Sequence, residues 1–322
     1  MAREKFENRR LTGAINVANK FEDGTVRYWK ADKAEVVQQI QSILQEYRQQ
    51  GYTLTLRQLH YQMVTNNWIV NHTTSYKKLG NILDDCRYSG VVDWFAIEDR
   101  GRVPILPYSV TGIPGALEDT VDQYRLNRQE GQANIVEVWT EKDALSGILR
   151  RTSEEYHVRL VVNKGYSSSS AMYMAYQRIV ENYENACKTI ILYIGDHDPS
   201  GLDMVRDITE RLGFMLEHGR NGITPSDCLM VVPIGLTMAQ VKKYKLPPNP
   251  AKMTDSRSEE YIKKFGKICW EVDALKAPVL TGLLREHIEN WVDMDAYRAM
   301  VDKETEEITE LQGFIDKFNT EE

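Results

Sequence analysis

One stretch of the chain, Ile190–Gly201, constrains the fold more than any other. Its apolar first half, Ile190–Ile194, is typical of a buried strand in a parallel sheet. Two carboxylates, Asp196 and Asp198, follow at once, and an apolar repeat with helical spacing begins after Gly201. Because ligands of parallel α/β sheets bind at the carboxyl ends of strands, this pattern predicts a ligand site there. Paired acids at such a place favour a hard divalent cation, usually magnesium.

The rear of the chain alternates between strand patterns and helix patterns. Strands are expected at 135–139, 158–162, 190–194 and 229–232, and helices at 142–150, 171–186 and 200–216. Such alternation predicts an α/β fold in which helices cover a parallel sheet. We assign residues 134–322 to this domain, including a helical extension at its C-terminal end.

The front of the chain predicts three helices and then a strand. The first helix is capped by Asp32 and ends before Gly51, the second begins near Thr55, the third spans about 74–86, and the strand spans 91–97. This order is the pattern of a winged helix-turn-helix, a frequent DNA-docking module.

Three boundaries follow from this organisation. Residues 1–30 are expected to form an arm, which either contacts phosphates or is simply a loosely ordered terminus. Residues 31–110 form the predicted winged-helix domain. A stretch rich in proline and glycine, followed by polar residues, predicts a linker over 111–133.

Tyr61 and Arg57 are the candidate reactive pair of the second helix. Leu56, Leu59 and Met63 share its main apolar stripe, and Tyr61 falls nearly opposite Leu59. Arg57 lies four residues before Tyr61, hence on the same face. A guanidinium there could lower the pKa of the phenol or hold a phosphate beside its oxygen. The alternative is that Tyr61 packs against the neighbouring domain.

Glu141 is a third candidate metal ligand because it lies just past the strand at 135–139. Carboxyl ends of parallel strands cluster at one edge, so Glu141 could face Asp196 and Asp198 and share a magnesium ion with them. The alternatives are a helix N-terminal acid for Glu141 and a capped turn for the two aspartates.

The overall charge and the cysteines constrain the function only weakly. Residues 1–110 carry 15 Lys and Arg against 12 Asp and Glu, whereas the remainder carries 25 against 35. The basic front of the chain is compatible with DNA contact, and the acidic rear is compatible with metal binding. Four dispersed cysteines, no membrane-length apolar run and no secretory signal predict a cytoplasmic protein with reduced thiols.

Several motifs of the chain resemble one known family. Glu141-Lys142, Lys164-Gly165 and Asp196-His197-Asp198-Pro199-Ser200-Gly201 look like a Toprim domain in its topoisomerase VI A-subunit form. Arg57-Gln58-Leu59-His60-Tyr61 resembles the tyrosine motif of the winged-helix domain in that family. The chain is similar to type IIB topoisomerase A subunits, to the related meiotic double-strand-break protein, and most closely to short stand-alone "mini-A" forms of bacteria and phages.

The resemblance implies a mechanism and a set of partners. A homodimer would clamp double-stranded DNA, and Tyr61 would become joined to a 5′ end. Magnesium held by Glu141, Asp196 and Asp198 would stabilise the reacting phosphate, helped by Arg57. The acids of one protomer would serve the tyrosine of the other. The DNA phosphates would contact basic side chains, for which we single out Lys77, Lys78, Arg87 and Lys164.

The chain also departs from the family pattern. Gln58 and His60 replace an acid and an aromatic residue, and nothing resembles the ATPase subunit, which would then be a separate partner. Two other functions stay open: a Toprim endonuclease in which water attacks, and a DNA-binding scaffold without catalysis.

Overall fold

The structure is a computed structural model that describes residues 14–20, 26–98, 107–163, 165, 167–219, 222–250 and 258–321. Its elements are, in chain order, β1 (Ala14–Lys20), β2 (Val26–Asp32), α2 (Lys33–Gln49), α3 (Leu56–Thr65), α4 (Thr73–Tyr88), η1 (Trp94–Ala96), α5 (Ile113–Gln123), β3 (Asn134–Thr140), η3 (Asp143–Leu145), α6 (Ser146–Glu155), β4 (Arg159–Val162), α7 (Ser169–Glu184), β5 (Lys188–Ile194), α8 (Pro199–His218), α9 (Pro225–Cys228), β6 (Leu229–Gly235), α10 (Met238–Tyr244), β7 (Asn249–Pro250), α11 (Ser258–Phe265), β8 (Ile268–Cys269), η4 (Val272–Ala274), α12 (Ala277–Glu289) and α13 (Met294–Glu321).

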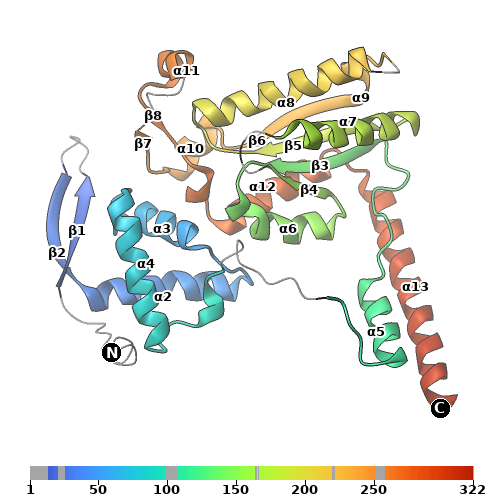
Figure 1. The fold of residues 1–322 in the computed structure, drawn as a ribbon, viewed down its shortest axis with the longest axis horizontal. Coiled ribbons are helices and arrows are strands. Elements are labelled where there is room, and N and C mark those ends of the chain that lie inside the picture. The colour runs from blue at the N-terminus through green and yellow to red at the C-terminus, as the bar shows by residue number, and fades with distance from the viewer. Residues whose placement is uncertain are drawn as a thin grey trace.

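A four-stranded parallel sheet organises the rear of the chain, which confirms the predicted α/β fold. Its strand order is β4-β3-β5-β6. Helices α7 and α8 cover one face, and α6 and α12 cover the other (Figure 1). The two central strands end together, because Thr140 of β3 is the register partner of Ile194 of β5. The segments that follow these strands therefore start side by side.

The strand β5 is buried on both faces. Ile190, Leu192 and Ile194 point to the core beneath α6 and α12, whereas Ile191 and Tyr193 point to the core beneath α7 and α8. This alternation follows from the two-residue period of a strand. It explains why the sequence reads as one continuous apolar run.

The three predicted front helices are present as α2, α3 and α4, and local capping explains where two of them start. Asp32 accepts a hydrogen bond from the backbone N–H of Ala34 at 3.1 Å. Thr55 and Gln58 form a reciprocal capping box at the start of α3. Short polar side chains thus set these boundaries, as the sequence predicted.

The predicted strand at 91–97 is wrong. Residues Trp94–Ala96 form the 3-10 helix η1, and Ile97 alone makes an isolated bridge to Leu54. Asp93 caps η1 by accepting from the backbone N–H of Phe95 at 3.0 Å, and Arg87 donates to the carbonyl of Ile97 at 2.7 Å. These local hydrogen bonds compete with the extended conformation that the apolar residues favoured.

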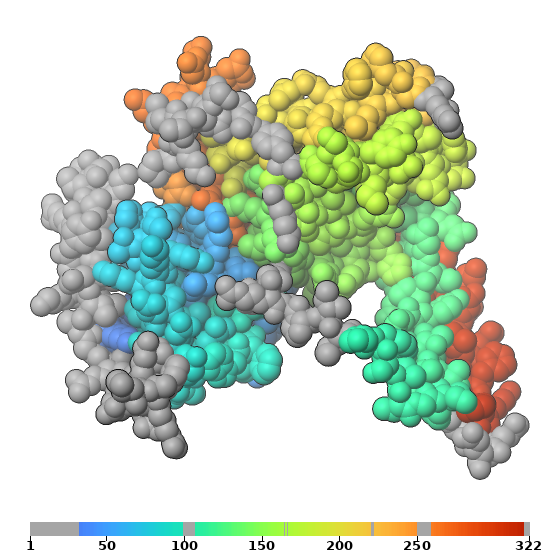
Figure 2. Space-filling model, in the orientation of Figure 1, coloured from blue at the N-terminus to red at the C-terminus, as the bar shows by residue number. Residues whose placement is uncertain are grey.

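The arm and the linker predicted from the sequence both contain regular structure. Within residues 1–30, β1 pairs with β2 in an antiparallel hairpin. Within 111–133, α5 packs along α13, and Arg128 ties the segment to Glu304 by an ion pair of 2.6 Å. Figure 2 shows the α5–α13 pair projecting from the body on the side away from α2–α4.

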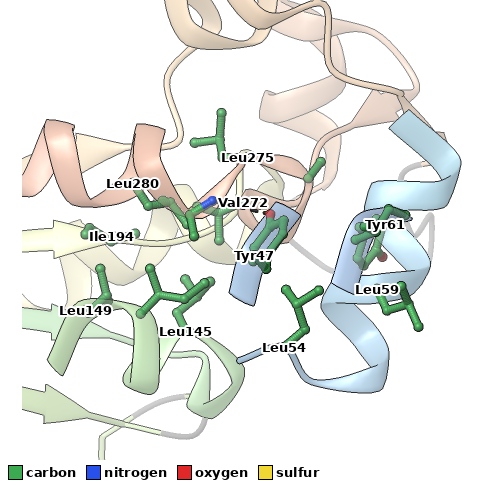
Figure 3. Packing of buried hydrophobic residues seen from close by; sticks show 14 of the residues in the cluster. Tyr47, Leu54, Leu59, Tyr61, Leu145, Leu149, Ile194, Val272, Leu275 and Leu280 are labelled. Carbon is green, nitrogen blue, oxygen red and sulfur yellow. Dashed lines mark hydrogen bonds between the residues drawn. The ribbon is translucent and has the colours of Figure 1, made fainter. Parts of the chain in front are cut away.

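The front helices and the sheet share one hydrophobic core. Tyr47 and Leu54 of the front unit pack in the same buried cluster as Leu145, Leu275 and Leu280 of the rear unit (Figure 3). This shared core seats α3 directly against η4. In the described parts of the chain, no helix has the length and apolar character needed to cross a membrane.

Candidate active site

Polar side chains from both units meet at the carboxyl edge of the sheet. Lys142 follows β3, Asp196 follows β5, and Glu271 and Asp273 come from the segment around η4. An antiparallel bridge between His197 and Trp270 holds the η4 segment against the end of β5. The core shared with α3 then brings the front unit onto the same edge.

Three carboxylates form a compact cluster there. Ligand oxygens of Asp196, Glu271 and Asp273 lie within 4.8 Å of one another. The backbone N–H of Val272 donates to Asp196 Oδ1 at 2.8 Å, which orients that side chain. Asp273 is 1 % exposed, and its Oδ1 has no hydrogen-bond partner among the described residues. The cluster could hold a metal ion, and Asp273 keeps one ligand oxygen available for it.

The Lys142 ammonium lies among these three acids. Its Nζ is 2.7 Å from Asp196 Oδ1 and 3.0 Å from Glu271 Oε2, and it also pairs with Asp273. Burial disfavours the charged amine, but the three carboxylates outweigh it and raise the pKa of Lys142. The site thus carries its own cation.

The acids respond differently to this environment. Burial raises the pKa of Asp196 to about 7, against the lowering effect of Lys142. Burial would also raise the pKa of Glu271, but the charges of Lys142 and Arg57 overcome it and hold the value at about 2. Glu271 is therefore ionised near neutral pH, whereas Asp196 loses its charge more easily than Glu271 does.

Tyr61 and Arg57 reach this cluster from α3. The guanidinium carbon of Arg57 lies 5.9 Å from the centre of the Tyr61 ring, which confirms the predicted shared face. Arg57 Nη2 donates to Glu271 Oε2 at 2.5 Å, and its Nε lies 3.8 Å from Asp273 Oδ2. The Tyr61 hydroxyl donates to Glu271.

The phenol of Tyr61 is held in its protonated form in this structure. Tyr61 is 6 % exposed, and burial raises its pKa, as does the Glu271 carboxylate. Its ring belongs to the core that the front helices share with the sheet, so Tyr61 also has the packing role that the sequence left open. Tyr61 nevertheless lines an open pocket together with Arg57 and Glu271. Both roles therefore fall on one side chain.

Glu141 and Asp198 form a separate acidic pair next to the cluster. Burial raises the pKa of Glu141, and the charge of Asp198 raises it further; the backbone N–H of Asp196 donates to Glu141. Asp198 caps α8 by accepting from the Gly201 N–H at 2.6 Å. Of the three ligands predicted from the sequence, only Asp196 belongs to the compact cluster, so the predicted trio is gathered only in part.

A close backbone approach explains the Pro-Ser-Gly turn after Asp198. A Cβ atom on Gly201 would lie 2.2 Å from the carbonyl oxygen of Asp196. Only glycine therefore allows the first turn of α8 to pack onto the end of β5. This packing fixes the direction in which the Asp196 side chain leaves the strand.

The predicted DNA-binding side chains have different environments. Lys77 and Lys78 are exposed on α4. Arg87 is partly buried and donates to the carbonyls of Trp94 and Ile97, so its guanidinium has a structural use. Lys164 lies outside the described residues.

The sequence interpretation missed Glu271 and Asp273 as site residues. The signal was present, because Glu271-Val272-Asp273 repeats the spacing of Asp196-His197-Asp198: two carboxylates separated by one residue. The strands that precede Glu271 are only two residues long, so the sequence before this acid pair shows no clear strand pattern. Lys142 was noted as part of a motif, but its place among the acids was not expected.

Comparison of the chain with protein-family models, with curated proteins and with solved structures finds no match.

The donor set fits magnesium. Three carboxylates offer hard oxygen ligands, which Mg²⁺ prefers, and the orphan Oδ1 of buried Asp273 gives one of them an open coordination position. Lys142 now balances part of the negative charge, so a metal ion and this ammonium would compete for the same oxygens.

Proposed function

We propose that the protein cleaves DNA by magnesium-dependent transesterification, with Tyr61 as the nucleophile, in the manner of topoisomerase VI A subunits. One observation carries the proposal: the Tyr61 hydroxyl and the Arg57 guanidinium both donate to Glu271, which lines a pocket with them and belongs to the metal-compatible acidic cluster. The order of the front helices and the parallel sheet also supports the resemblance to winged-helix and Toprim domains.

The residues divide the chemistry between them. The Tyr61 oxygen attacks a backbone phosphorus while Glu271 accepts its hydrogen bond, and its proton passes to solvent, because a carboxylate with a pKa of about 2 is too weak a base to keep it. A new bond joins this oxygen to the 5′ phosphate, the bond from phosphorus to the 3′ oxygen breaks, and that oxygen leaves as a hydroxyl by taking the proton of Glu141, whose raised pKa favours its protonated form. Arg57 and Lys142 supply positive charge beside the phosphate oxygens.

Asp196, Glu271 and Asp273 would hold the magnesium ion, with Glu141 and Asp198 close by. When bound, magnesium supplies Lewis-acid stabilisation of the charge that develops on the phosphate oxygens. Glu141, whose pKa is raised by burial and by Asp198, is then placed as a proton carrier at the same edge.

The contact between tyrosine and acids lies within a single chain. The family resemblance implied that the acids of one protomer serve the tyrosine of the other, whereas here Tyr61 hydrogen-bonds to Glu271 of its own chain. We propose that each chain carries a complete site and cuts one strand, and that a homodimer cuts both strands of double-stranded DNA.

A plasmid cleavage assay tests this function. Supercoiled plasmid, magnesium and the full chain should yield denaturant-trapped protein–DNA adducts that proteinase releases. Tyr61→Phe should abolish both adducts and cutting. Tyr47→Phe is the matched control, since Tyr47 is another buried tyrosine of the front unit, and it should keep both activities. Cutting by Tyr61→Phe at the wild-type rate would refute the tyrosine mechanism.

A water-using nuclease is the second candidate, and one observation favours it. Burial and Glu271 both raise the pKa of Tyr61, which makes the phenol a weaker nucleophile in this conformation. In such an enzyme a water molecule would attack, with Glu141 as the proton carrier. The two reactions are separated by the product: only the tyrosine mechanism leaves protein covalently joined to DNA.

A further inference from the structure

A pocket of about 490 Å³ opens beside Tyr61. This Tyr61 pocket is formed mainly by the rings of His60, Tyr61 and Tyr76 and by the amides of Asn71 and Asn249. Its volume lies within the roughly 300–1,000 Å³ typical of small-molecule sites. Nothing in the cleavage mechanism uses the rings of His60 and Tyr76 or the two amides.

The aromatic walls suit a flat ligand. The ring centre of His60 lies 5.6 Å from that of Tyr61 and 5.6 Å from that of Tyr76, with interplanar angles of 71° and 88°. The His60 ring therefore packs edge to face against both tyrosine rings, and all three residues line the pocket. Aromatic side chains are the usual platforms on which proteins stack unpaired bases.

The polar groups suit a neutral ligand that carries both donors and acceptors. Asn71 donates to the side chain of Asn249, and Asn249 Nδ2 donates to Glu271 Oε1 at 3.3 Å. Side-chain amides can both donate and accept, as the edge of a nucleobase requires. His60 is 3 % exposed, its Nε2 lies 3.4 Å from Asn71 Oδ1, and its Nδ1 lacks a partner among the described residues.

The charges argue against a phosphate inside the pocket. Arg57 is the cation of the described lining, and it is already paired with Glu271 at 2.5 Å. Burial lowers the pKa of His60, so its ring is neutral near pH 7. A phosphate inside the pocket would add a second negative charge beside the Glu271 carboxylate, and Arg57 would have to offset both, whereas a neutral base adds no charge.

We propose that the Tyr61 pocket receives one unpaired nucleobase adjacent to the phosphate that Tyr61 attacks. This inference rests on the proposed function for its position in the reaction, and it names the substrate class: DNA that is single-stranded or locally unpaired at the cleavage point. A base stacked in a duplex cannot enter, since it must first leave its pair and its neighbours.

Oligonucleotide binding tests the inference without cleavage. The full chain with Tyr61→Phe keeps the ring but cannot form adducts, and binding is measured in EDTA by fluorescence anisotropy. Three probes of one length are compared: an intact single strand, the same strand with abasic sites at its centre, and the perfect duplex. The intact strand should bind more tightly than the other two.

Pocket variants in this background give the decisive comparison. Tyr76→Ala and Asn71→Ala should each weaken binding of the intact strand, and loss of stacking by Tyr76→Ala should amount to about 5- to 150-fold. Binding of the abasic strand should not change. Asn81→Ala is the matched control, because Asn81 is exposed on the same helix as Tyr76 and lies outside the pocket lining.

Two results would overturn the inference. If the variants lost equal affinity for the intact and the abasic strand, the pocket would hold only DNA backbone. If they lost no affinity for either strand, the pocket would not bind DNA. If Tyr76→Ala fails to fold, a single strand with 2-aminopurine at its central position provides the test. Its fluorescence must be quenched when it binds to the Tyr61→Phe protein. Base-dependent binding without adducts from the wild type would refute only the cleavage function. Adducts with base-independent binding would refute only the pocket.

Discussion

Replacement of Lys142 by methionine should destabilise the protein strongly and make its stability depend on magnesium. The Lys142 side chain is 12 % exposed and pairs with three carboxylates, at 2.7 Å from Asp196 and 3.0 Å from Glu271. Methionine keeps most of the apolar stem but removes the charge, and buried acids are left without their countercharge. Removal of one partner from a buried ion pair costs about 3–5 kcal/mol, so we expect a loss of that size in EDTA.

A matched substitution at the surface gives the reference. Lys276 pairs with Glu46 at 2.8 Å, but both side chains are more than 40 % exposed. Such an exposed pair contributes at most about 1 kcal/mol, so Lys276→Met should change stability little. Urea unfolding of both variants and the wild type at pH 8 measures the difference.

Magnesium should then restore part of the loss in Lys142→Met. A ligand at 100 times its dissociation constant stabilises a folded protein by about 2.7 kcal/mol. Without the competing ammonium, Lys142→Met should gain more stability from the same magnesium concentration than the wild type does. Two results would refute the reasoning that the ammonium and the metal share these oxygens. One is a stability of Lys142→Met in EDTA that lies within about 1 kcal/mol of that of Lys276→Met. The other is an equal gain of stability from magnesium in Lys142→Met and in the wild type.

Three other outcomes are expected. The pKa of Glu271 is held at about 2, below its ordinary 4.5, so its contribution to stability is present above about pH 4.5 and is lost as the pH falls toward 2. Urea unfolding at a series of pH values should show this loss in the wild type but not in Glu271→Gln. The pKa of Asp196 is raised from 3.8 to about 7, so stability should decline as the pH rises through this interval in EDTA, and Asp196→Asn should flatten that decline. Mixing Tyr61→Phe protein with Glu271→Gln protein should restore no DNA adducts, because both groups act within one chain; recovered adducts would place them in different protomers.

Local patterns were sufficient for most of the helices and strands. Helical spacing and short polar caps predicted α2, α3 and α4, and continuous apolar runs predicted the four strands of the sheet. The exception at 91–97 has a local cause as well, since the Asp93 cap and the Arg87 hydrogen bonds turn an apolar run into a 3-10 helix. Residue type alone did not reveal which of these competing interactions would prevail.

The edge of the sheet was predictable because strand ends in a parallel sheet must meet. That rule places Asp196 and Glu141 near one another on the sequence alone, and the paired ends of β3 and β5 agree with it. It could not place Glu271 and Asp273, which follow two-residue strands and reach the edge only through the bridge between His197 and Trp270.

The sequence by itself therefore determined most of the elements, the parallel sheet and the helix face shared by Tyr61 and Arg57, since each depends on residues a few positions apart. Only the tertiary structure decided which acids surround that face. The core that joins Leu54 to Leu275 brings α3 onto η4, and contacts between residues more than 200 positions apart leave no periodic trace in the sequence.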